Sequence, residues 1–177
     1  DGSLLRGFRR ALDGSGALEV SFLDFCKATK SIGITIDAHR LFGTSSPDYL
    51  RLEQVAPEAA RLVGRFRAWL GERFGGPGEL FLALEPGDDG GRLPEAAFKE
   101  GCKTHGFEGT EVDLHEIWCL LDVDGAGALA MEDVMILDTD KKRREGSVLK
   151  SAMKTKLEHE SWMAEAYRED TRKTLAP

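Results

Sequence analysis

An apolar spacing that recurs four times constrains this sequence more than any other feature. Four aliphatic residues each follow a short loop rich in Gly, Asp or Ser, and a second apolar residue follows each of them five positions later. The four pairs are Val20 and Phe25, Leu50 and Val55, Leu93 and Phe98, and Leu129 and Val134. A constant internal spacing indicates that one supersecondary unit is used four times.

The segments between these loops have helical periodicity. Apolar residues recur three and four positions apart, as at Leu5, Phe8 and Leu12. Pro57 favours a helix start, and Gly75 ends the apolar face that follows it. That face comprises Leu62, Phe66, Trp69, Leu70 and Phe74. Strand signals cover only two or three residues beside each loop. The sequence therefore predicts an all-α protein of helix–loop–helix units, with short antiparallel loop strands and a further C-terminal helix.

The loop at residues 122–133 resembles an EF-hand calcium loop. Asp122 and Asp124 occupy loop positions 1 and 3, Gly127 occupies position 6, and Asp133 occupies position 12. Oxygen ligands at alternating positions can wrap around Ca²⁺, and a glycine at position 6 permits the sharp turn. Over residues 4–138 the chain is therefore similar to the EF-hand superfamily, in a calmodulin-like arrangement of four hands.

The resemblance implies a domain organisation. Hands I and II would form a lobe over residues 1–74, which ends in a long linking helix. Hands III and IV would form a second lobe over residues 75–140, and residues 141–177 would form a basic helical tail. The loops would pair as I with II and III with IV. Val20 would then face Leu50, and Leu93 would face Leu129.

The resemblance also assigns the metal ligands of hand IV. Asp122, Asp124 and Asp133 would bind through their carboxylates, and Ala128 at position 7 would bind through its backbone carbonyl. Positions 5 and 9 are Ala126 and Ala130, which offer no side-chain oxygen. In addition, Asp133 is shorter than the usual glutamate. We expect weak calcium binding with magnesium as a competitor, or a loop that keeps its fold without a cation.

Hand I, at residues 13–24, departs further from the pattern. Its candidate ligands are Asp13, Ser15, Glu19 and Asp24. Leu18 stands where the turn glycine is expected, and Ala17 removes a ligand. The alternative role of Asp13 is to flank a helix end.

Hands II and III are expected to bind no cation. Hand II has Pro47 at position 5 and ends in Gln54. Hand III is one residue too long and has Ala97 at its last position. Asp88 and Asp89 in hand III are expected to form a solvated turn.

The side chains outside these loops bear on two further kinds of chemistry. Cys102, His105, His115 and Cys119 have spacings that zinc could use, but buried thiols and surface histidines explain them better. The sequence contains no Gly-x-Ser-x-Gly motif, and its Gly-Gly-Pro-Gly run lacks the lysine of a phosphate-binding loop. These motifs predict no enzymatic activity.

Charge is distributed unevenly. Residues 1–140 carry 14 basic and 25 acidic side chains, whereas residues 141–177 carry 10 basic and 6 acidic ones. An acidic body argues against nucleic-acid binding. In the tail, Leu149, Met153, Leu157 and Trp162 form a stripe that suits docking on an acidic protein surface. The alternative is a solvent-exposed helical extension.

These features together predict a non-enzymatic adaptor that binds protein partners, within a larger assembly. The competing interpretation is a calcium sensor that acts through hand IV, and through hand I as well, on a target helix. Three scattered cysteines favour a reducing compartment, so we expect a cytoplasmic location, with the cytoskeleton as one candidate site. No apolar run approaches the roughly 20 residues of a membrane-spanning helix, and no signal peptide is recognised.

Overall fold

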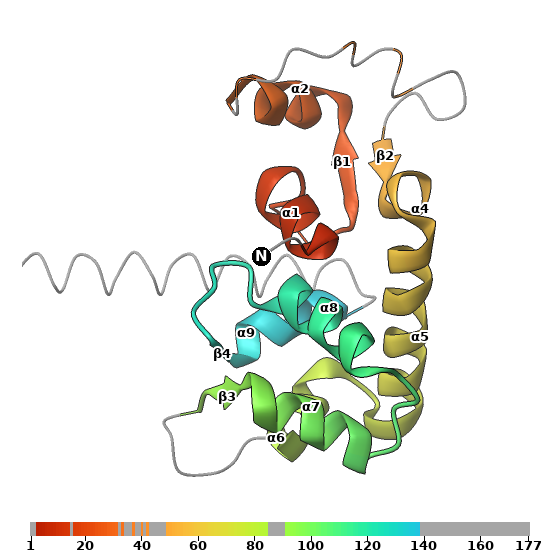
Figure 1. Cartoon of the computed structure of the whole chain (residues 1–177), viewed down its shortest axis with the longest axis vertical. Coiled ribbons are helices and arrows are strands. Elements are labelled where there is room, and N and C mark those ends of the chain that lie inside the picture. The colour runs from red at the N-terminus through yellow and green to blue at the C-terminus, as the bar shows by residue number, and fades with distance from the viewer. Residues whose placement is uncertain are drawn as a thin grey trace, which may run out of the picture.

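The computed structural model of the chain is mostly helical, as predicted from the sequence. It describes residues 3–14, 16–31, 33, 37, 40, 42, 49–84 and 91–138. Two small antiparallel sheets of two strands each accompany the helices (Figure 1). Ser15, the loops at 43–48 and 85–90, and the tail from residue 139 lie outside the described residues.

The first half of the described chain contains one helix–loop–helix segment, followed by a short strand and a one-turn helix. Its elements are α1 (Leu4–Ala11), β1 (Glu19–Ser21), α2 (Phe22–Ser31), β2 (Tyr49–Arg51) and α4 (Leu52–Val55). Ser3 caps α1, because its hydroxyl accepts a hydrogen bond from the backbone N–H of Arg6. Val55, the second residue of the pair that begins at Leu50, is 47% exposed at the end of the single-turn helix α4.

The second half begins with the longest helix. Its elements are α5 (Pro57–Phe74), α6 (Pro77–Leu84), β3 (Leu93–Pro94), α7 (Glu95–Thr104), α8 (Glu111–Leu121), β4 (Ala128–Leu129), α9 (Met131–Val134) and the 3₁₀ helix η1 (Met135–Leu137). Helix α5 begins at Pro57 and ends before Gly75, as the sequence predicted. It runs along one side of the molecule from the β1–β2 pair to α6 (Figure 1).

The strand registers match the predicted ones. Val20 lies opposite Leu50 between β1 and β2, and Leu93 lies opposite Leu129 between β3 and β4. All four side chains are buried. Each short sheet therefore joins two loops and places one aliphatic side chain from each loop in the interior.

The hydrophobic core does not divide at residue 74. One large cluster joins α1 and α4 to α5, α6, α7, α8 and η1. A smaller cluster contains Val20, Phe25, Phe42 and Leu50. Helix α1 packs chiefly on α8, which lies next to it in Figure 1. The two-lobe boundary stays a prediction, but the first helix shares its apolar contacts with the second half of the chain.

The apolar face of α5 packs inward as expected. Phe66 is fully buried, and its ring packs against those of Trp69, Phe98 and Phe107. Arg67, on the same helix, is only partly exposed, and its Nη2 donates to the Ile136 carbonyl at 3.1 Å. This contact ties the end of η1 to the middle of α5.

Within the described part of the chain, no helix combines the length and the apolar character needed to cross a bilayer.

Candidate cation-binding loops

The hand IV loop is organised around the Asp122 carboxylate, directly after α8. Both of its oxygens lie within hydrogen-bonding distance of the Gly127 N–H, at 3.3 and 3.4 Å. Gly127 has a φ of +76°, in the left-handed region that favours glycine. Asp124 accepts a hydrogen bond from the Ala126 N–H at 3.2 Å. The loop therefore turns sharply at Gly127, and the carboxylates of Asp122 and Asp124 accept backbone hydrogen bonds within it.

A cationic side chain from α1 also reaches this loop. Arg6 Nη2 lies 3.3 Å from Asp122 Oδ2, and the two side chains are only 17% and 4% exposed. Because Asp122 is nearly inaccessible to water, its charge needs a nearby partner. Arg6 supplies that positive charge from within the chain.

Asp133, the expected last ligand, caps α9. Its Oδ2 accepts a hydrogen bond from the Ala130 N–H at 2.8 Å. Burial raises the pKa of this carboxyl, and Asp124 and Glu132 raise it further, while the Ala130 hydrogen bond and Arg92 oppose the shift. The Asp133 carboxylate therefore accepts a hydrogen bond at the start of its own helix, α9. Its burial and the neighbouring acidic residues disfavour its ionised form.

Hand I repeats the arrangement of hand IV around Asp13. This carboxylate is buried and accepts hydrogen bonds from the Leu18 N–H at 2.7 Å and the Ala17 N–H at 3.2 Å. Leu18 has a φ of +60°, although it is not a glycine. The loop therefore keeps the left-handed turn at position 6 and buries a leucine there.

The other hand I candidates face different partners. Asp24 is exposed and bonded to the Ser21 hydroxyl and to Lys27, which lower its pKa. Glu19 pairs with Arg51 at 3.6 Å. Among the described residues no group of three or more acidic, His or Cys side chains could hold a metal ion.

Arg9 brings a second positive charge between the two loops. Its Nη1 donates to the Asp13 carbonyl at 3.3 Å. Burial lowers the pKa of this guanidinium, and the charges of Asp13 and Asp133 oppose that shift. A Cβ on Gly16 would lie 2.8 Å from Arg9 Nη1 and 3.1 Å from Ile136, so the hand I loop packs closely on both.

The zinc candidates are only partly brought together. His115 Nε2 lies 3.5 Å from Cys119 Sγ, and His115 Nδ1 lies 2.8 Å from Glu95 Oε1. Cys102 is fully buried, which raises its pKa to about 12. His105 instead makes an edge-to-face contact with the ring of Phe74. Both thiols are therefore core residues, as the alternative interpretation predicted.

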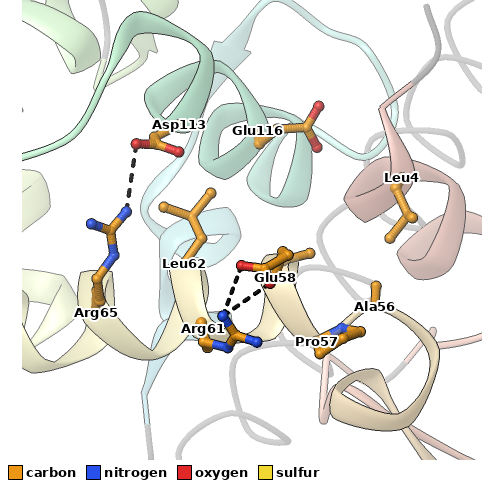
Figure 2. A pocket seen from close by; sticks show the side chains of 10 residues that line it. Leu4, Ala56, Pro57, Glu58, Arg61, Leu62, Arg65, Asp113 and Glu116 are labelled. Atoms are coloured by element: carbon orange, nitrogen blue, oxygen red, sulfur yellow. Dashed lines mark hydrogen bonds and ion pairs between the residues drawn. The ribbon is translucent and has the colours of Figure 1, made fainter.

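An open groove lies between α1, α5 and α8 (Figure 2). It encloses about 730 Å³, and its apolar lining includes Leu4, Ala59 and Leu62. Across the groove, α8 contributes Asp113 and Glu116. Sequence reasoning missed both this groove and the role of Arg6. The sequence shows that α1 carries three arginines, but no local pattern indicates that Arg6 contacts Asp122, which lies 116 residues away.

Comparison with known proteins adds no relative. The chain matches no protein-family model, no curated protein and no solved structure.

Proposed function

We propose that this chain is a non-enzymatic, EF-hand-like structural adaptor that binds other proteins and has at most one or two weak calcium or magnesium sites. The observation that carries the proposal is the contact of Arg6 with Asp122. In a calcium sensor, the loop carboxylates are available to the ion. Here the Asp122 carboxylate, at position 1 of hand IV, lies 3.3 Å from the Arg6 guanidinium. The same carboxylate also accepts a hydrogen bond from the Gly127 backbone N–H.

Hand I supports the same proposal. Asp13 accepts two backbone hydrogen bonds, and Arg9 lies beside it. A cation that entered this loop would have to compete with these donors and with a nearby positive charge. Removing ligands and adding positive charge both weaken a hard-cation site.

A calcium sensor that works through hand IV remains the second candidate. It is favoured by Asp122 and Asp124 at positions 1 and 3 and by the left-handed turn at Gly127. Binding would then require Ca²⁺ to displace Arg6 from Asp122. Such a displacement would couple the ion to the position of α1, because Arg6 belongs to that helix.

The absence of catalysis is part of the proposal. The grouping of Cys119, His115 and Glu95 has the residue types of a nucleophile, a base and an orienting acid. However, Cys119 is 0% exposed, so a substrate would have no path to its sulfur in this conformation. A hydrogen-bonded core thiol accounts for the arrangement. Three free cysteines also fit the proposed reducing, cytoplasmic location.

Calorimetric titration of the full chain with Ca²⁺, in the presence and absence of Mg²⁺, tests the proposal. We expect dissociation constants weaker than about 100 μM, compared with roughly 0.1–10 μM for sensor sites. A dissociation constant in the sensor range, together with a change in helical content, would instead establish the calcium sensor.

A further inference from the structure

We propose that the groove between α1, α5 and α8 is the docking site of the chain's own tail, residues 147–162, within the same molecule. The inference rests on the proposed adaptor function and identifies which surface the tail occupies. Three features support it: the apolar lining of the groove, the charges at its edges and the length of chain that leads to it.

The apolar lining of the groove matches one helical stripe. Leu4 is 48% exposed at the start of α1, and Ala59 and Leu62 line the groove from α5. Figure 2 shows Leu62 directed from α5 toward α8, between the charged residues. A cavity of about 730 Å³ is large enough for several apolar side chains. The tail offers Leu149, Met153 and Leu157 at i, i+4 and i+8, on one face of a helix.

The charges beside this stripe complement the α8 edge. Asp113 and Glu116 line the groove from α8. In the tail, Lys150, Lys154 and Glu158 each follow an anchor residue by one position, so they lie along the same side of the stripe, with the two lysines toward its N-terminal end. A tail helix with that side toward α8 would place two lysines opposite two carboxylates.

The arginines on the α5 edge do not reverse this match. Arg61 pairs with Glu58 at 2.9 Å, and Arg65 pairs with Asp113 at 3.5 Å (Figure 2). These pairs lie at the surface and contribute little energy on their own. The apolar anchors are therefore expected to supply most of the docking energy, and the lysines its orientation.

The chain is long enough to reach its own groove. The contact between Arg67 and the Ile136 carbonyl holds the end of η1 beside the middle of α5. Ala59 lies eight residues before Arg67 on α5, a rise of about 12 Å. The connecting segment, residues 139–146, can span up to about 26 Å when extended. Docking within one molecule also has an effective concentration in the millimolar range, which a second copy would not match at micromolar protein.

Amide hydrogen exchange of the full chain tests the assignment. In the wild-type protein we expect protection of residues 147–162. We expect Leu4→Asp in the groove, and separately Met153→Asp in the tail, to reduce that protection at least about tenfold. Each variant has a matched control. Leu82→Asp alters another exposed leucine, on α6, and Thr155→Asp alters a tail residue outside the stripe. Both controls should retain wild-type protection.

A charge exchange tests the orientation. Lys150→Glu combined with Lys154→Glu should weaken protection, and Glu116→Lys in the same chain should restore part of it. Unprotected tail amides in the wild-type chain, or protection that survives Leu4→Asp, would overturn the proposal. Protection that rises with protein concentration would also overturn it, because the tail would then dock on a second copy. None of these measurements of tail protection depends on calcium. A strong calcium site would therefore refute the adaptor function but would leave the docking of the tail to be judged by amide exchange alone.

Discussion

Arg6 in α1 and Asp122 at the end of α8 are 116 residues apart in the chain, yet their side chains lie 3.3 Å apart. The pair joins the first helix to the loop that most resembles a calcium site. An external cation at this loop would have to share the Asp122 carboxylate with Arg6.

Replacing Arg6 should therefore have two opposite consequences. Arg6→Gln leaves the buried Asp122 carboxylate without its cation, and we expect a loss of about 2–4 kcal/mol in the free energy of unfolding. The same variant should bind Ca²⁺ more tightly than the wild type. Urea unfolding with and without calcium measures both effects.

Arg10→Gln is the matched control for this variant. Arg10 lies on the same helix and is exposed, so its replacement should change stability by less than about 0.5 kcal/mol. If Arg6→Gln is equally mild and its calcium affinity is unchanged, Arg6 does not act as the internal cation of hand IV.

The left-handed backbone at Leu18 predicts an unusual order of stability. Leu18→Ala should cost about 2–4 kcal/mol, because the leucine side chain is buried in the main core. Leu18→Gly removes the same side chain but relieves the strain of a φ of +60°, which is worth roughly 1–2 kcal/mol. The glycine variant should therefore be more stable than the alanine variant.

Gly127→Ala tests the same backbone argument in hand IV. No atom lies within 4 Å of the added Cβ, so the expected loss of about 1–2 kcal/mol is conformational alone. Thermal unfolding of the three variants checks the order. An alanine at position 18 that is more stable than glycine would contradict the left-handed conformation there.

The fold and the strand registers could be predicted because they depend on local patterns. The spacing of Leu93 and Leu129 within their units fixes which residues face each other once two loops pair. Pro57 and Gly75 fix the ends of α5 through local backbone preferences. The contact of Arg6 with Asp122 could not be predicted in this way, because it depends on how α1 packs against α8. Repeat spacing likewise does not reveal that α4 ends after one turn or that Val55 at its end is exposed.

Asp133 should make stability depend on pH in a predictable direction. Burial raises the pKa of this carboxyl, so its charge is disfavoured in the folded state at neutral pH. Stability is therefore gained as pH falls through the raised pKa. Asp133→Asn can still accept the Ala130 hydrogen bond but carries no charge. We expect it to be up to about 1 kcal/mol more stable than the wild type at pH 7 and equal to it near pH 3.

Unfolding by urea across this pH range measures the difference. Asp24→Asn is the contrasting variant, because the hydrogen bonds of Asp24 with Ser21 and Lys27 lower its pKa. Its replacement should give no gain at neutral pH. A gain at pH 7 for Asp24→Asn but not for Asp133→Asn would contradict the assignment.

The pairing of β3 with β4 predicts that Leu129 is indispensable to the interior. Leu129→Asp would place an uncompensated charge at a fully buried position opposite Leu93, and we expect a loss of more than about 4 kcal/mol. Leu82→Asp introduces the same group at an exposed position on α6 and should cost less than about 1 kcal/mol. Urea denaturation followed by circular dichroism distinguishes the two. If Leu129→Asp is tolerated as well as Leu82→Asp, the side chain does not lie between the paired loops, and the hand IV strand does not hold them together.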